Sequence, residues 1–217
     1  MTTHPTRRRQ LPPGRVDFSI MYLTHDAFLR DLERLRAATR EGRTGDLAVR
    51  TGWETFKHQL HVHHVGEDEA IWPQLRERLE RAEDVAVMDL MEAEHGAIDP
   101  MQDRIDAAFA VGGGELAAAV EEFADALAAH MEHEEERALP LVETHLGPEG
   151  WARYSQYMLT SQGLPEAGAY LAWLLDGAPG AAREKTLGVL PEPVRTMFLD
   201  RFEPQYAAAG HWSATAA

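Results

Sequence analysis

The sequence contains no cysteine. This absence excludes disulfides, zinc ribbons, thiolate-bound clusters and cysteine nucleophiles. No apolar run approaches the roughly 18 residues of a membrane-spanning helix. The basic cluster Arg7-Arg8-Arg9 is followed by Leu-Pro-Pro-Gly rather than by the apolar core of a secretory signal. We therefore expect a cytoplasmic protein without a membrane partner.

Positive charge is scarce, with 21 Lys and Arg against 36 Asp and Glu and a formal net charge of −15. Nucleic-acid binding requires clustered Lys and Arg, so we expect no nucleic-acid partner. The 217 residues and a hydrophobic fraction of 44% are sufficient for one large domain with a buried core. The 11 histidines stand out, and their placement is informative.

Convincing strand alternation is also missing, and apolar residues recur with the spacing of one helix face. The pattern predicts four long helices, with Pro73 and Pro140 as kinks, near residues 16–41, 47–81, 83–111 and 115–146. Amphipathic helices with short connections favour an all-α fold, an antiparallel up-down four-helix bundle.

Three segments are expected along the chain. Residues 1–15, with three prolines and the basic cluster, are predicted to be a disordered arm, and residues 16–147 the bundle. Residues 148–217 are predicted to be a C-terminal extension of short helices packed on the bundle, ending in a frayed tail at 207–217. Its aromatic residues either limit access to a site in the bundle or provide extra core or a dimer interface.

A repeat relates the second and fourth predicted helices. Residues 56–73 and 123–140 share the string F-x3-L-x2-H-x3-E-x-E-x3-P, displaced by 67 positions. Residues four apart lie on one helix face, so a histidine and a glutamate of each copy share the apolar stripe. A charge there is costly unless it is paired or binds a metal. The two pairs are His63 with Glu67 and His130 with Glu134.

The first and third predicted helices each place one histidine in their apolar stripe, His25 and His95. In an antiparallel hairpin, residues equidistant from the connection lie at one height. The sequence midpoints of His25–His63 and His95–His130 fall at predicted connections, and that of His63–His95 falls near the expected end of the second helix. The four imidazoles and two carboxylates are thus predicted to form one layer that binds two transition-metal ions. The alternative is a buried network of hydrogen bonds.

This pattern resembles the hemerythrin-like HHE cation-binding family, whose signature is a His on one helix followed by His-x3-Glu on the next, twice. The resemblance covers about residues 17–146. It implies an oxo- or hydroxo-bridged non-haem di-iron centre that binds or reacts with dioxygen, peroxide or nitric oxide. It also implies two iron ions with Glu67 and Glu134 as bridges and four terminal ligands, His25, His63, His95 and His130.

The chain departs from the oxygen carriers of that family at two positions. Their second third-helix histidine is replaced by Asp99, and their bridging carboxylate lies one position later, where Glu135 follows Glu134. The spacing of the repeat favours Glu134, and the missing imidazole favours redox reactivity over oxygen carriage. Asp99 and Glu92 are further candidate ligands, and Tyr22 is a candidate hydrogen-bond donor to bound oxygen.

The remaining histidines are predicted to be peripheral. Among them are His61 and His64. A register shifted by one residue, in which His64 and Asp68 form the His-x3-acid pair in place of His63 and Glu67, is the alternative.

Three functions fit this sequence: dioxygen binding, storage or sensing; an enzyme that decomposes peroxide in a catalase- or peroxidase-like reaction; and iron storage or buffering. Zinc and manganese could replace iron, because imidazole and carboxylate ligands accept all three. Monomer and homodimer are both left open.

Overall fold

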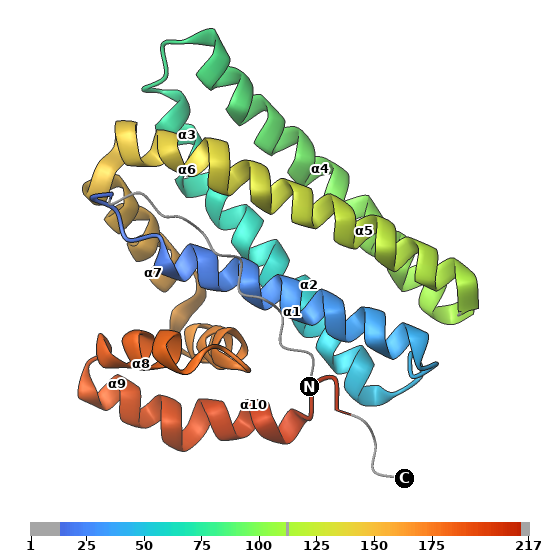
Figure 1. Ribbon diagram of the computed structural model, residues 1–217. Helices are drawn as coiled ribbons and strands as arrows, with labels where there is room; N and C mark the ends of the chain where they lie inside the picture. The colour runs from blue at the N-terminus through green and yellow to red at the C-terminus, as the bar shows by residue number, and fades with distance from the viewer. Residues whose placement is uncertain (1–13, 112, 214–217) are drawn as a thin grey trace.

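The computed structural model describes residues 14–111 and 113–213 (Figure 1). Within these ranges all regular secondary structure is helical, which confirms the predicted all-α class. None of the helices in the described ranges is long and apolar enough to cross a membrane. The predicted disordered arm lies outside the described residues apart from Gly14 and Arg15.

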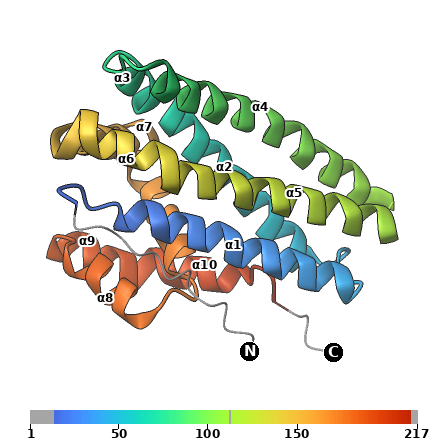
Figure 2. The same cartoon turned by 45° about the horizontal axis from the view of Figure 1, so that its top comes forward.

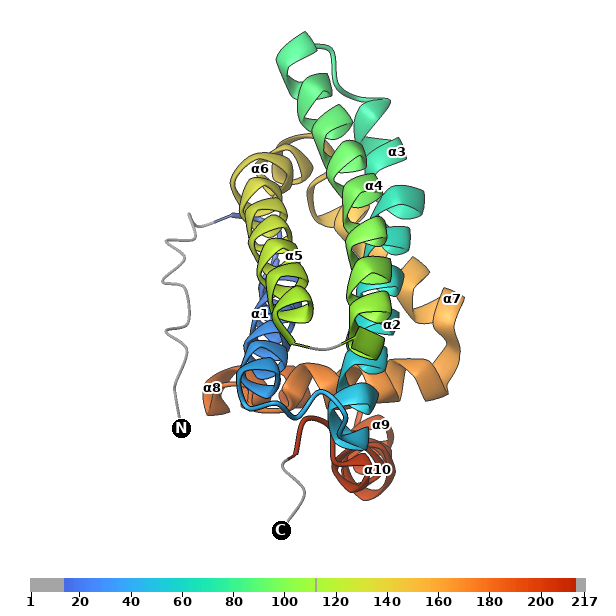
Figure 3. The ribbon, with the colours of Figure 1, turned by 90° about the vertical axis from the view of Figure 1, so that its right-hand side faces the viewer.

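Four long helices run along one another, and in Figure 3 they form two neighbouring pairs. Among these helices, α1 contacts α2 and α5, and α4 contacts the same two helices. Their inward faces carry the apolar residues whose helical spacing is visible in the sequence. The bounds are α1 Ser19–Arg40, α2 Leu47–Ala70, α4 Ala82–Val111 and α5 Gly113–His133.

Both copies of the repeat interrupt their helix at the same place. The predicted helix 47–81 ends with α2 and resumes as α3 (Trp72–Arg76), whose first turn contains Pro73. In the other copy, α5 passes into a π-helical turn, η1 (Glu134–Ala138), and then α6 (Leu139–Leu141) with Pro140 in its first turn. Proline has no N–H to continue the ladder of helical hydrogen bonds, which explains the shared position. A second π-helical turn, η2 (Val142–Leu146), follows.

The chain beyond η2 forms further helices beside the four long ones (Figures 1 and 2). Gly163, with φ 75°, divides α7 into two helical stretches. Trp173 of α7 is fully buried, and its Nε1 donates a hydrogen bond of 2.8 Å to Asp31 on α1. These elements are α7 Gly147–Leu175, α8 Gly180–Gly188, α9 Glu192–Met197, η3 Phe198–Phe202 and α10 Glu203–Ala209.

The prediction of a frayed tail was wrong for residues 207–213, while 214–217 lie outside the described residues. Trp212 is buried, and its backbone N–H donates a hydrogen bond of 2.9 Å to the carbonyl of Ala48. Its ring lies on Gly52 of α2, where an added Cβ would overlap the indole. A glycine in the second turn of α2 thus provides the space in which the tail docks.

We expect Gly52→Ala to lower the free energy of unfolding by about 1–3 kcal/mol, because the methyl group displaces the Trp212 ring. Gly96→Ala is the matched control, since an added Cβ there meets nothing, and it should stabilise by about 0.5–1 kcal/mol. Chemical denaturation measures both. The Gly52→Ala penalty should vanish in a Trp212→Ala background. A penalty unchanged by removal of Trp212 would contradict this docking.

Candidate metal centre

A polar layer crosses the apolar interior of the four long helices. None of its members is more than 6% exposed, and one apolar cluster lies on each side of it. Phe28 and Phe56 belong to the first cluster, and Met88 and Met91 to the second. The layer comprises His25 of α1, His63, His64 and Glu67 of α2, His95 of α4, His130 of α5 and Glu134 of η1.

The ligand atoms of this layer fall into groups within 4.8 Å of one another. These are His25, His63 and Glu134; His64, His95 and His130; and Glu67, His130 and Glu134.

Glu67 lies between the first two of these groups and faces a histidine of each. Its Oε1 lies 3.2 Å from His63 Nε2, and its Oε2 lies 3.5 Å from His95 Nε2. On the opposite side, Glu134 Oε2 lies 3.0 Å from His25 Nε2. A carboxylate whose two oxygens point at two different groups has the placement that bridges two ions.

The buried imidazole nitrogens and carboxylate oxygens are better placed to bind a metal ion than to form hydrogen bonds with one another. Within the described part of the chain, the oxygens of Glu67 and Glu134 and the Nε2 atoms of His25, His63 and His64 form no hydrogen bond of good geometry, although His25 and His63 each lie close to a carboxylate oxygen. Buried polar atoms are normally paired, and those without partners need an explanation. Imidazole nitrogens and carboxylate oxygens at this spacing are ligands that first-row transition metals accept. A metal ion therefore accounts for atoms that hydrogen bonding leaves unsatisfied.

The two central carboxylates repel each other. Burial, the Glu134 carboxylate and Asp68 raise the pKa of Glu67 well above its usual range. A buried negative charge beside another is unfavourable unless a positive charge compensates it. A divalent cation supplies that charge.

The imidazoles differ in their preference for a proton. Burial and the neighbouring histidines lower the pKa of His63 and His64 well below the usual range, so both are neutral and ready to bind metal. Burial alone would lower the pKa of His25, but contacts with Glu134 and Glu135 outweigh it and raise that pKa to about 9. A metal ion at His25 must therefore displace a proton.

Carboxylates outside the layer orient three of the rings. Nδ1 of His25 lies 2.8 Å from Glu135, Nδ1 of His95 lies 2.9 Å from Asp68, and Nδ1 of His130 lies 3.0 Å from Glu94. A metal-binding histidine usually donates its second N–H to such an acceptor, which directs Nε2 toward the ion. These contacts leave the three Nε2 atoms facing the interior.

Sequence reasoning missed these acceptors, although the repeat contains a signal for two of them. Asp68 and Glu135 occupy equivalent positions, each directly after the glutamate of the His-x3-Glu pair. Asp68, in the first copy, contacts His95 of the helix before the second copy, and Glu135, in the second copy, contacts His25 of the helix before the first. The two contacts are therefore related by the repeat.

The structure brings together all six residues predicted as ligands, and Glu134 rather than Glu135 lies in the layer. The prediction that His64 is peripheral was wrong. His64 is 6% exposed, and its ring stacks on that of His95 with centroids 4.0 Å apart. Because α2 contacts both α1 and α4, adjacent residues can both face inward: His63 lies beside His25 and His64 beside His95.

Asp99, Glu92 and Tyr22 lie outside the layer. Asp99 is exposed and accepts a hydrogen bond from Gln102, and Glu92 is exposed and pairs with Arg76 on the surface. Neither is a ligand in this arrangement, because both project from the outer face of α4. Tyr22 is half-buried with its ring against Phe18.

Glu67→Gln should stabilise the metal-free protein by about 1–2 kcal/mol, because the amide removes one of two repelling buried charges. The same change should lower iron uptake, since an amide is a poor bridge. Glu77→Gln, at an exposed position just beyond α3, serves as the control and should alter neither quantity. Urea unfolding and elemental analysis measure the two effects. A less stable metal-free Glu67→Gln protein would contradict the repulsion.

Comparison with known proteins gives one match. The family model of the hemerythrin HHE cation-binding domain matches residues 16–142, which include every member of the layer. Neither the curated proteins nor the solved structures contain a match to this chain. The match covers more than half of the chain and coincides with the buried histidine and glutamate residues. The chain belongs to the hemerythrin HHE cation-binding domain family.

Proposed function

We propose that the protein holds two iron ions in this layer and binds or reacts with dioxygen or its reduction products. The observation that carries the proposal is the pairing of two ligand groups with Glu67 between them. One ion would be held by His25, His63 and Glu134. The other would be held by His64, His95 and His130, with Glu67 reaching both.

A di-iron centre supplies two redox-active ions that together bind and reduce dioxygen. The chain contributes imidazoles whose outer nitrogens are held by carboxylates, so the inner nitrogens are fixed before a metal arrives. Glu67 and Glu134 offset part of the charge of two divalent ions in a buried site. The apolar clusters on either side keep bulk water from the layer.

The position of His64 supports dioxygen binding. The sequence pattern predicts four imidazoles, one fewer than the oxygen carriers use, and this number favours redox reactivity. With His64 in the layer the number of buried imidazoles is five. Dioxygen binding is therefore our first candidate, with peroxide decomposition and iron storage as the functions that the experiment below separates from it.

We also propose that residues 16–147 form an antiparallel up-down four-helix bundle on which residues 148–217 pack as an extension. The contacts of α1, α2, α4 and α5 support the first part. The burial of Trp173 and Trp212 against α1 and α2 supports the second.

Anaerobic loading with ferrous iron should give two iron ions per chain by elemental analysis. On exposure to air, a charge-transfer band in the visible spectrum should appear and should reverse under vacuum. Sustained oxygen evolution from added hydrogen peroxide would instead favour the enzyme, and accumulation of many ions per chain would favour storage. Iron content near zero, or content unaffected by joint replacement of His63 and His130 with alanine, would contradict the metal site.

His64→Ala should reduce the iron content toward one ion per chain and abolish the reversible band, because one group loses a nitrogen ligand. His61→Ala is the matched control, since His61 is exposed on the same helix. Far-ultraviolet circular dichroism verifies that both variants fold. If the two variants retain equal iron and equal reversibility, His64 is not a ligand.

A further inference from the structure

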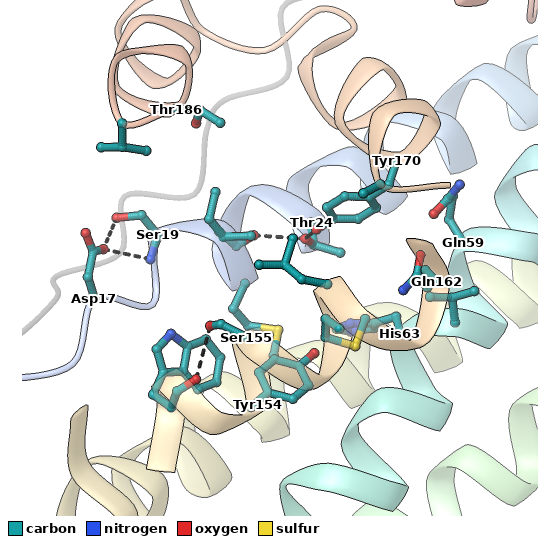
Figure 4. Close-up of a pocket in the computed structure, with 18 of the residues that line it drawn as sticks. Asp17, Ser19, Thr24, Gln59, His63, Tyr154, Ser155, Gln162, Tyr170 and Thr186 are labelled. Atoms are coloured by element: carbon teal, nitrogen blue, oxygen red, sulfur yellow. Dashed lines mark hydrogen bonds between the residues drawn. The ribbon is translucent and has the colours of Figure 1, made fainter. Parts of the chain in front are cut away.

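A cavity of about 410 Å³ lies beside the polar layer, between the start of α1, the middle of α2 and helices α7 and α8 (Figure 4). This volume is in the range of about 300–1,000 Å³ typical of small-molecule sites. The side chains of α7 and α8 in its wall lie beyond the region matched by the family model. The cavity is thus partly built by the segment that this chain adds to the family domain.

The wall of the cavity is mainly apolar. Its aliphatic part comes from Ile20, Met21, Val62, Met158, Leu159 and Ala167, and Trp151, Tyr154 and Tyr170 add aromatic faces. Val189, 76% exposed, also lines it, so the cavity opens to solvent on that side. Burying apolar ligand surface against such a wall is favourable, because it removes that surface from water.

The cavity's charged groups neutralise each other. Lys185 Nζ lies 2.7 Å from Asp17 Oδ2 and donates a hydrogen bond of 2.7 Å to Ser19 Oγ. Figure 4 shows Asp17 and Ser19 at the end of the cavity away from His63. Because the ammonium and the carboxylate already form an ion pair, neither attracts a charged ligand. The ligand that suits this cavity is uncharged.

One buried acceptor in the wall has no partner. Gln59 is 4% exposed, and within the described ranges its Oε1 accepts no hydrogen bond. Nearby, Thr24 Oγ1 donates a hydrogen bond to the carbonyl of Ile20, and the Tyr170 hydroxyl, 2.6 Å away, donates to Thr24. An unpaired buried acceptor is unfavourable, and a ligand hydroxyl that donates to Gln59 would remove that cost. The ligand therefore carries a hydrogen-bond donor.

The cavity also marks a difference between the two halves of the repeat. His130 Nδ1 is covered by Glu94, the residue that directly precedes His95. The residue that directly precedes His25 is Thr24, and in the described part of the chain no carboxylate hydrogen-bonds His63 Nδ1. His63 lines the cavity instead. The cavity thus takes the place of a covering carboxylate and reaches one of the two ligand groups only.

We propose that this cavity binds an uncharged, largely apolar alcohol or phenol, whose hydroxyl donates to Gln59 and whose hydrocarbon part lies against the apolar wall and His63. Binding at the cavity needs no metal. That the bound molecule would lie beside one iron ion is the only part that rests on the function proposed above.

Isothermal titration calorimetry of the full metal-free chain with 2-naphthol tests the proposal. We expect 2-naphthol to bind and naphthalene-2-sulfonate, an anion without a hydroxyl donor, to bind at least about tenfold more weakly. Gln59→Leu should weaken 2-naphthol about tenfold and leave naphthalene unchanged. No binding of 2-naphthol, or equal binding of the sulfonate, would overturn the proposal.

A filled cavity provides the matched control. Ala167→Phe projects into the cavity and should abolish 2-naphthol binding, whereas Ala169→Phe lies exposed on the same helix and should bind as the parent does. Both variants should take up iron like the parent, which verifies that they fold. Parent-like 2-naphthol binding by Ala167→Phe would overturn the assignment to this cavity. If the parent chain binds 2-naphthol but takes up no iron, the proposed di-iron function is refuted and the assignment of this cavity stands.

Discussion

The structure depends on one constraint, the burial of two glutamates and five histidines in a single layer inside an apolar interior. Without a cation, Glu67 and Glu134 repel each other, and among the described residues their oxygens accept no hydrogen bond of good geometry. Such an arrangement lowers stability, so it persists because something outside the chain compensates the charge. Two divalent ions, each beside a group of imidazoles, would do so. The apolar clusters on both sides then supply the stability that the layer does not.

The repeat arranges this layer, and its imperfections give the two halves different surroundings. Asp68 and Glu135 contact the Nδ1 atoms of His95 and His25, which occupy equivalent positions in the two halves of the repeat. The relation fails at Thr24, where the other half has Glu94, and at that point helices α7 and α8 form a cavity against His63. One half is closed by a carboxylate and the other faces an apolar chamber. The added C-terminal helices therefore change the access to one ligand group.

Sequence periodicity was sufficient for the helical class and for predicting that these six histidines and glutamates lie together, because the repeated His-x3-Glu spacing and the hairpin midpoints depend only on helix geometry. His64 was missed because the sequence analysis assumes that each helix has one apolar stripe and therefore one inward face. In the structure α2 packs between two helices, so two adjacent residues face inward. The docking of Trp212 was missed for a related reason: the space above Gly52 is tertiary, and nothing local in the tail indicates it. The cavity likewise arises from segments that are far apart in the sequence, within residues 17–24, 59–63 and 151–189.

Anomalous X-ray diffraction at the iron edge, from crystals of the iron-loaded protein, tests the central claim most directly. The account predicts two peaks per chain about 3–4 Å apart, the spacing usual for paired ions. One peak should lie among His25, His63 and Glu134 and the other among His64, His95 and His130, with Glu67 between them. A single peak, or peaks outside this layer, would contradict it.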